Sequence, residues 1–289
     1  MDVRKKLGKV LFGIGILIFT ILMLFPFLMM LSTSLKSMSE INSPTFSMIP
    51  KEFAWSNFSK ALSNGNWKRY FANSIYITGI STVIAVVINS MAGFAFARLK
   101  FRHKNLLFTL VMVGMIVPTQ VIMLPAYVIM KYIPFAGGNS ILGQGGTGLL
   151  NTQTGLILMY LSGAFGVFLF RQFMMNFPSA LDDAAKIDGL SRFGTYLRIY
   201  MPLSKPVIAT MVVLRATATW NDYMWPLLMT PKDSMYTVQL ALSRFRNAEL
   251  TQWNYVMAVT AVSIIPVILL FLFFQKYFIQ GIVTTGMKD

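Results

Sequence analysis

The sequence predicts an all-α polytopic membrane protein with six transmembrane helices. Of its 289 residues, 55% are hydrophobic and 12% are charged, whereas soluble domains carry about 25% charged residues. The apolar residues gather into runs of roughly 20, the length that a helix needs to cross a hydrocarbon core of about 30 Å. Because an open chain satisfies its backbone polar groups in lipid only as a helix, each run predicts one spanning helix.

The first apolar run follows Arg4, Lys5, Lys6 and Lys9. A signal peptide has an apolar core of about 7 to 15 residues, followed by a small-residue cleavage site. This run is longer and lacks such a site, so it predicts an uncleaved span. The six predicted spans are residues 10–31, 73–97, 106–130, 154–173, 207–228 and 255–278.

Five prolines lie within these spans, and four of them lie in the third, fifth and sixth. Proline lacks the backbone N–H and clashes with the preceding helical turn, so it kinks or ends a helix. We expect Pro118 and Pro125 to kink the third span. We also expect Pro226 to end the fifth span and Pro266 to bend the sixth.

Lysine and arginine are distributed unevenly between the two sides of the predicted membrane. With the N-terminus inside, 15 of the 25 Lys and Arg residues lie on the cytoplasmic side and nine lie in the longer outer loops. The positive-inside rule therefore predicts that both termini are cytoplasmic. We expect residues 1–72 to hold the N-terminal tail, first helix and first outer loop. Residues 73–289 are the predicted core domain, with five helices and a cytoplasmic loop at 174–206.

Composition excludes several classes of function. The net charge of +15 does not predict nucleic-acid binding, because the basic residues flank apolar spans instead of lining one soluble face. The absence of cysteine excludes disulfides and thiolate metal sites, and the single His103 has no evident partner for a metal. The glycines between 137 and 148 lack a following Gly-Lys-Ser/Thr, so they predict an outer loop and not a phosphate-binding loop.

The polar loop between the fourth and fifth spans predicts a short helix. Pro178 and Ser179 are typical of a helix start, and Ser179 with Asp182 forms a capping-box-like pair. Asp182 and Asp183 suit the positive end of the helix dipole, and Gly189 is typical of a helix end. This pattern alone is compatible with a connector on lipid headgroups or with a docking element for another protein.

Three stretches resemble one family of transporters. The pattern acid-Ala-Ala-x3-Gly-x9-Ile-x-Met-Pro, from Asp183 to Pro202, resembles the cytoplasmic signature Glu-Ala-Ala-x3-Gly-x9-Ile-x-Leu-Pro of ABC importer permeases. Residues 220–228, Trp-Asn-Asp-Tyr-Met-Trp-Pro-Leu-Leu, and residues 266–281 resemble the sugar-transporting members. The chain as a whole resembles the maltose-type second permease subunit of the carbohydrate-uptake family. Asp183 and Met201 depart from the signature but keep its charge and bulk.

The resemblance implies a type I ABC importer permease fold and an assembly in a bacterial or archaeal plasma membrane. In this family a second, homologous permease completes the path, and an extracytoplasmic sugar-binding protein delivers the sugar. Two cytoplasmic ATPase subunits bind ATP and Mg²⁺, and each holds one coupling helix in a cleft. This chain would bind no cofactor and would not be an enzyme. The implied ATPase-coupling residues are Asp183, Ala184, Ala185, Gly189, Ile199 and Pro202.

The stretch at the end of the fifth span combines aromatic and hydrogen-bonding side chains, as sugar sites do. The candidate substrate-pathway residues are Trp220, Asn221, Asp222, Tyr223 and Trp225. Polar groups at bilayer depth often indicate function, but an aromatic belt with a structural Asn or Asp is the alternative. Arg215 and Asp222 lie seven residues apart on one helix face, roughly 10 Å along the axis, so we expect no direct ion pair.

The last outer loop predicts a contact with the binding protein, although a loop on the membrane surface is the alternative. Its candidate contact residues are Arg244, Phe245, Arg246 and Trp253. Other classes of membrane protein fit the sequence less well. A secondary transporter would need coupling-ion carboxylates within its spans, where only Asp222 is available, and a membrane enzyme would need clustered acids or histidines. Among permeases, an importer of a polyol or a glycerol phosphate stays open.

Overall fold

The computed structural model describes residues 2–248 and 252–285, with side chains described within 7–245 and 252–277. The described secondary structure is entirely helical. Two compact units divide the chain. The first holds Met1–Trp67 and Leu242–Ile265, and the second holds Lys68–Ala241 and Pro266–Asp289.

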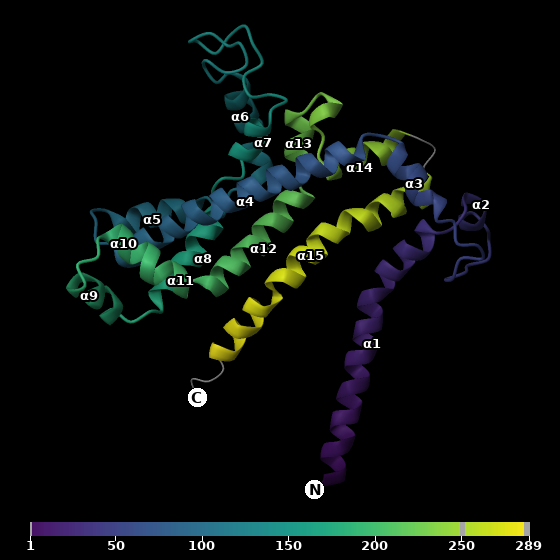
Figure 1. Cartoon of the computed structure of the whole chain (residues 1–289), viewed down its shortest axis with the longest axis horizontal. Helices are drawn as coiled ribbons and strands as arrows, with labels where there is room; N and C mark the ends of the chain where they lie inside the picture. Colours follow the sequence, from purple (N-terminus) through teal and green to yellow (C-terminus); the bar gives the residue numbers. More distant parts are fainter. Residues whose placement is uncertain (1, 249–251, 286–289) are drawn as a thin grey trace. The chain divides into compact units, whose positions relative to one another are not determined.

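The first unit contains three helices of its own and parts of two others (Figure 1). They are α1 (Asp2–Ser34), α2 (Met38–Ile41), α3 (Ser56–Ser63), the end of α14 (Val238–Ala248) and the start of α15 (Trp253–Thr285). The second unit carries the remaining elements, including the other parts of α14 and α15. These are α4 (Trp67–Arg98), α5 (Lys104–Val113), α6 (Thr119–Lys131), α7 (Gln153–Leu158), α8 (Ala164–Met175), α9 (Ala180–Ile187), α10 (Arg192–Thr195), the π-helix η1 (Tyr196–Tyr200), α11 (Met201–Leu203), α12 (Lys205–Asn221), α13 (Met224–Met229) and the 3-10 helix η2 (Asp233–Met235).

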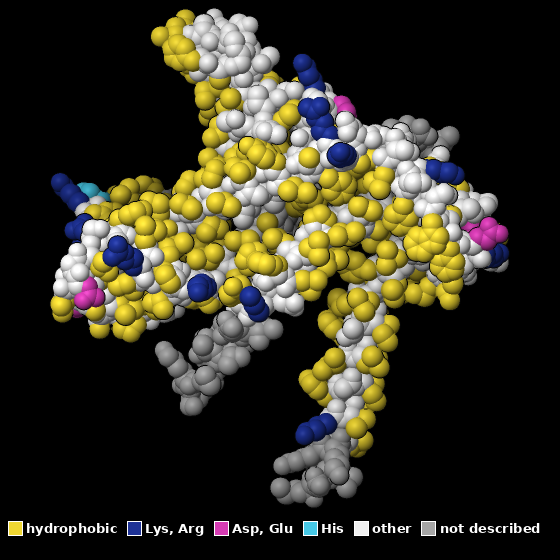
Figure 2. All heavy atoms as spheres, in the orientation of Figure 1, with side chains coloured by type: hydrophobic (Ala, Val, Ile, Leu, Met, Phe, Trp, Pro, Cys, Tyr) yellow, Lys and Arg dark blue, Asp and Glu magenta, His cyan; other side chains and the backbone are white. Residues whose placement is uncertain are grey.

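Helix α1 exposes its apolar side chains, and none of its most apolar stretch is buried within the chain. Figure 2 shows hydrophobic side chains along its length. Asn57 anchors the polypeptide that follows. Its buried side-chain amide donates to the carbonyls of Ser34 and Lys36 at 2.9 Å each, and its oxygen accepts from Asn254 at 3.3 Å. The segment that follows α1 is therefore fastened to the start of α15.

Three described helices are long and apolar enough to cross a membrane: Leu7–Ser34, Trp67–Arg98 and Trp253–Tyr277. A fourth is reached if Arg192–Leu203 and Lys205–Asn221, which meet at 79°, form one broken span. The third and fourth predicted spans are not continuous helices, so the expectation of one unbroken helix in the fourth was wrong, whereas the third is interrupted just before Pro118, where a kink was expected. Each is a pair of shorter helices, α5 with α6 and α7 with α8.

The breaks have local causes. Pro118 has extended backbone (ψ 135°) and is the N-cap residue just before α6, a position whose N–H has no partner within the helix. Gly163 is also extended and begins α8. Pro226 does not end the fifth span as predicted, because α12 already ends at Asn221 and Pro226 lies inside α13.

Two hydrophobic clusters hold the second unit together. One joins α4, α8, η1 and α12 and contains Val86, Phe94, Phe170, Met174, Tyr196, Tyr200, Val207 and Met211. The other joins α4, α6, α7 and α13 and contains Ile77, Met123, Leu156, Ile157, Tyr160, Trp225 and Met229. Helix α4 contributes to both, so it is the central helix of the unit.

Helices α4 and α8 approach closely because glycine lies at the contact. A Cβ on Gly93 would stand 2.5 Å from the Cβ of Phe170 and 2.9 Å from the backbone nitrogen of Arg171. Asn89, one turn earlier on α4, accepts from the Ser162 hydroxyl at 3.1 Å and from the Gly163 N–H at 3.3 Å. Small residues permit such packing between membrane helices. Asn89 provides a hydrogen-bond acceptor for the backbone N–H of Gly163, just before α8.

The glycine-containing segment after α6 is a loop, as predicted. Asn139 organises it, since its side-chain nitrogen donates to the carbonyls of Lys131 and Ile133 at 2.9 and 3.0 Å. Its oxygen accepts from the Gly146 N–H at 2.9 Å. One amide side chain thus fixes both sides of this loop.

Candidate functional site

Helix α9 ends in a Schellman motif centred on Gly189. The Gly189 N–H donates to the Lys186 carbonyl at 3.1 Å, and the Leu190 N–H donates to the Ala185 carbonyl at 2.9 Å. Gly189 has φ +71°, a left-handed conformation that glycine adopts without a steric penalty. The predicted helix end is therefore confirmed, and glycine sets the direction in which the chain leaves α9.

The predicted cap at the other end of α9 was wrong. Ser179 has helical backbone (φ −63°, ψ −23°), and its side chain makes no capping hydrogen bond. Asp182 turns toward other partners. Its Oδ1 accepts from the Tyr200 hydroxyl at 2.8 Å, and its Oδ2 lies 3.5 Å from the Arg98 guanidinium. The local capping pattern is overridden by a tertiary contact.

Arg98, the last residue of α4, contacts three parts of the segment 174–206 at once. Besides the ion pair with Asp182, it donates to the Phe177 carbonyl, and its guanidinium lies over the Tyr200 ring at 5.1 Å from the centroid. Burial, followed by the hydrogen bond to Asp182, raises the pKa of Tyr200. The phenol therefore stays protonated and remains a donor.

Helix η1 packs against one stripe of α4. Ser90, Phe94 and Arg98 are spaced four residues apart and share one face. The Ser90 and Tyr196 hydroxyls lie 2.7 Å apart, and the Phe94 ring lies 5.5 and 5.0 Å from the rings of Tyr196 and Tyr200. An inserted π-turn often occurs at functional sites, and here it directs both tyrosines toward α4.

The predicted coupling residues differ in exposure. Ala184 and Gly189 are exposed, and Asp183 is exposed and pairs with Lys186 at 2.9 Å. Ala185 is only 1% exposed, so it packs inside the chain. Ile187, which the pattern did not single out, is 87% exposed. Ala184 and Ile187 on α9, and Gly189 just beyond its end, are therefore exposed small or apolar residues among charged neighbours.

Of the other two predicted coupling residues, Ile199 lies within the π-helix η1 and Pro202 lies in α11, which follows it. Ile199 is half-buried against the cluster that contains Tyr196 and Tyr200, and Pro202 is exposed in α11. Figure 1 shows α9, α10 and α11 together at one end of the second unit. Ile199 thus seats the loop, whereas Pro202 lies at its surface.

A polar hollow of about 390 Å³ lies between the end of α4 and α9. Its charged lining residues are Arg98, Lys100, Asp182, Asp183, Lys186 and Arg192. Nearby, Lys104 donates to the carbonyls of Ala97 and Leu99 at 3.3 and 3.0 Å. Burial and the charges of Arg171 and Arg98 lower the pKa of Lys104. Within the part of the chain that the structure describes, no cluster of His, Asp and Glu could hold a metal ion.

Asp222 lies at the break between α12 and α13, within the predicted substrate pathway. One oxygen accepts from the Tyr160 hydroxyl at 2.8 Å, and the other accepts from the backbone N–H groups of Met224 and Trp225 at 2.9 and 3.3 Å. Arg215 donates to the Tyr160 carbonyl through Nε at 3.0 Å. Tyr160 therefore links Arg215 to Asp222.

The five predicted pathway residues face different surroundings. Trp225 is fully buried and donates to the Gly155 carbonyl at 3.3 Å, so it belongs to the core. Asn221 is exposed and accepts from Gln239 at 3.3 Å, and Tyr223 is 41% exposed. Trp220 is buried, with its ring 6.3 Å from that of Phe71. Asn221 and Tyr223 are the members that reach the surface.

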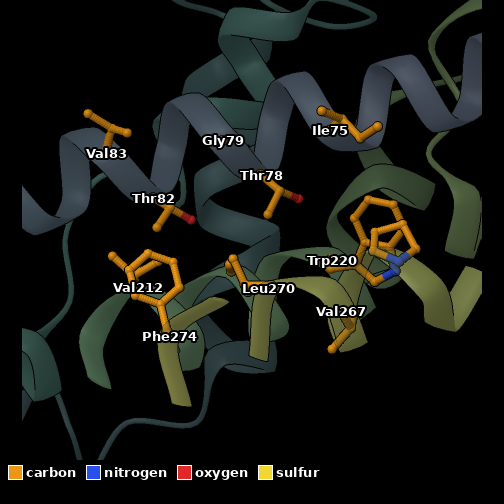
Figure 3. A pocket seen from close by; sticks show the side chains of 12 residues that line it. Ile75, Thr78, Gly79, Thr82, Val83, Val212, Trp220, Val267, Leu270 and Phe274 are labelled. Carbon is orange, nitrogen blue, oxygen red and sulfur yellow. The ribbon is translucent and has the colours of Figure 1, made fainter. Parts of the chain in front are cut away.

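Trp220 also lines an open groove of about 370 Å³ between α4, α12 and the middle of α15. Figure 3 shows Thr78 and Thr82 projecting from α4 toward Leu270 and Phe274. Among the described residues that line the groove, the two threonine hydroxyls and the indole N–H are the only polar side-chain groups. This lining suits aliphatic side chains or lipid better than a polar sugar.

The predicted binding-protein contacts lie in the first unit. Phe245 packs edge-to-face against Trp67 at 5.8 Å, so it supports the fold of this unit. Arg244 is exposed and Trp253 is 43% exposed. The side chain of Arg246 lies outside the described residues.

Sequence reasoning missed Arg98, Tyr200, Tyr160 and Asn89. Arg98 counted only toward topology, Tyr200 occupies a variable position of the signature between Ile199 and Met201, and Tyr160 lies in an apolar run without a motif. Their roles depend on pairing between distant segments, such as Asn89 with Ser162, for which a single sequence carries no signal.

Residues 89–284 match the family model described as the inner membrane component of binding-protein-dependent transport systems. The chain belongs to this family. It is thus an ABC importer permease, a transport component and not an enzyme. The arabinooligosaccharides transport system permease protein AraQ of Bacillus subtilis (strain 168) is 32% identical over 93% of this chain and 92% of that protein.

Other relatives are named for a different solute. The sn-glycerol-3-phosphate transport system permease protein UgpE of Brucella suis biovar 1 (strain 1330) is 29% identical over 98% of this chain and 97% of that protein. Among solved structures, a chain of a bacterial ABC transporter that imports the acidic polysaccharide alginate has a TM-score of 0.80 at 21% identity. The match covers 96% of this chain and 99% of that one, and it shows that the permease shares the ABC importer fold.

Proposed function

We propose that this permease carries a sugar, most simply an oligosaccharide, into the cytoplasm, driven by ATP hydrolysis on separate ATPase subunits. The similarity to a relative named for arabinooligosaccharides over 93% of the chain carries the proposal. Glycerol phosphate is the second candidate, because the relative named for that solute covers 98% of the chain. A polyol also fits, as its hydroxyls resemble those of a sugar.

Helix α9 is the proposed coupling helix, held by an ATPase subunit. The exposure of Ala184, Ile187 and Gly189 supports this role, because small and apolar side chains let another protein approach closely. Asp183 would make polar contacts at the rim. Ala185, Ile199 and Pro202 would act by shaping the loop.

The proposed assembly contains a second homologous permease, two ATPase subunits and an extracytoplasmic sugar-binding protein in a bacterial or archaeal plasma membrane. Within it, this chain would cross the membrane six times with both termini in the cytoplasm. The distribution of Lys and Arg supports this orientation. Residues 1–72 would form the peripheral part, and residues 73–289 the core domain.

For the substrate pathway we propose Trp220, Asn221, Asp222, Tyr223 and Trp225. The break between α12 and α13 supports it, since discontinuous helices line solute sites in many transporters. Asn221 and Tyr223 would face the solute, while Asp222 and Trp225 hold the turn. The binding protein would meet Arg244, Phe245, Arg246 and Trp253, with the exposed Arg244 and Trp253 making the contacts.

Purification from native membranes tests this function. We expect a C-terminally tagged chain to bring down a second permease, an ATPase and a solute-binding protein, identified by mass spectrometry. Calorimetric titration of that binding protein with arabino-oligosaccharides, polyols and glycerol 3-phosphate then names the solute class. Recovery of the chain alone would contradict the assembly, and binding of glycerol 3-phosphate alone would contradict the sugar.

A further inference from the structure

We infer that Arg98 and Tyr200 are positioning residues that lock the coupling helix to the end of α4, so that α9 and α4 move as one body. The inference rests on the proposed role of α9 as the ATPase contact. It concerns a joint between segments more than 80 residues apart in the sequence. We call this set of residues the α4 joint: Ser90, Phe94 and Arg98 from α4, Asp182 from α9, and Tyr196 and Tyr200 from η1.

The geometry of the joint restricts α9 at its first turn. Asp182 is bound by both Arg98 and Tyr200, at 3.5 and 2.8 Å. Arg98 also binds the Phe177 carbonyl, which lies just before the helix. One guanidinium therefore fastens the chain on both sides of the start of α9.

Burial makes this ion pair more significant than its neighbour on the same helix. The side chains of Arg98 and Asp182 are 11% and 26% exposed, whereas those of Lys186 and Asp183 are 75% and 67% exposed. Exposed pairs contribute little to stability. Removing one partner of a shielded pair leaves an uncompensated charge, so the Arg98–Asp182 contact resists opening.

Helix α4 is suited to carry the movement further. It has 32 residues, which corresponds to about 48 Å at 1.5 Å per residue. It packs against α8 at Gly93 and belongs to both hydrophobic clusters of its unit. A displacement of α9 by an ATPase would thus reach the centre of the second unit through the α4 joint.

Cross-linking with bifunctional thiol reagents of graded length tests the joint. The chain contains no cysteine, so Lys100→Cys and Lys186→Cys, which both line the hollow beside the joint, provide the only thiols of this chain. In the purified complex we expect the same reagent length to link the pair without nucleotide and with ATP plus vanadate. We call the set of reagent lengths that link the two cysteines the cross-linking profile. In an Arg98→Gln background we expect several lengths to link the pair, and we expect this profile to change when nucleotide is added.

Two further variants control the experiment. Arg102→Gln removes an exposed charge from the loop between α4 and α5 and should keep the parent profile. Arg98→Lys retains the ion pair, so its profile should lie between those of the parent and Arg98→Gln. A purely structural role would lower the yields of chain and ATPase together without changing the profile of surviving complexes. That outcome, or a parent profile that changes with nucleotide, would overturn the inference.

The proposed function has a separate readout. Ile187→Asp places a charge on the exposed surface of α9, away from the joint, and should prevent recovery of the ATPase. If Ile187→Asp left recovery unchanged, the coupling role itself would fail. If it abolished recovery while Arg98→Gln kept the parent profile, only the joint would be wrong.

Discussion

Gly189→Val lowers recovery of the ATPase with this permease by about 5- to 30-fold, the factor that corresponds to 1–2 kcal/mol. A left-handed conformation costs a residue with a Cβ about 1–2 kcal/mol, and Gly189 has φ +71° with no atom within 4 Å of an added Cβ. The effect is therefore one of backbone conformation and not of a clash. Relaxation of this strain would break the hydrogen bond from Leu190 to Ala185 and redirect the end of α9.

The series Gly189→Asn, Gly189→Ala and Gly189→Val should show increasing loss, because asparagine tolerates left-handed backbone best. Recovery is measured by quantitative mass spectrometry of the tagged complex, normalised to the amount of permease. Gly145→Val is the matched control, since Gly145 also has positive φ (+95°) and open space around it, but lies in the loop after α6. An equal loss in this control would argue against a specific role for Gly189.

Gly93→Ala has the second large expected effect, on the stability of the fold. The added Cβ would overlap the Cβ of Phe170 and the backbone of Arg171, so α8 would have to move away from α4. Overpacking of this kind typically costs 1–3 kcal/mol. We expect a lower thermal unfolding temperature of the detergent-solubilised complex and a lower yield in membranes.

Gly79→Ala is the control for this substitution. Gly79 lies on the same helix with nothing within 4 Å of an added Cβ, and alanine favours helix more than glycine by about 1 kcal/mol. The unfolding temperature should therefore stay the same or rise. Equal unfolding temperatures for Gly93→Ala and Gly79→Ala would show that the α4–α8 contact does not depend on glycine.

The parts of the structure that could be predicted from sequence are those with local causes. The apolar runs located the three long helices α1, α4 and α15, and Gly189 predicted the end of α9 because a left-handed residue there favours glycine whatever surrounds it. The signature from Asp183 to Pro202 led to the correct family. These features depend on residues close together in the chain.

The features that were not predicted depend on distant partners. Ser179 and Asp182 have a capping pattern, yet Asp182 binds Arg98 and Tyr200 because they offer a stronger, charge-assisted contact. The fourth span breaks where Asn89 can accept from the start of α8. Pro226 was expected to end a helix, but Asp222 ends α12 first and caps α13 with its carboxylate.

The most direct test of ATPase coupling through α9 is cysteine cross-linking in intact membranes. Ile187→Cys places a thiol on the exposed surface of α9, and Phe46→Cys places one between α2 and α3, on the side proposed to be extracytoplasmic, where the side chain is 73% exposed. With a short lysine–thiol reagent, we predict that Ile187→Cys links to the ATPase and that Phe46→Cys does not. A link from Phe46→Cys to the ATPase, or none from Ile187→Cys, would contradict both the coupling role and the proposed orientation.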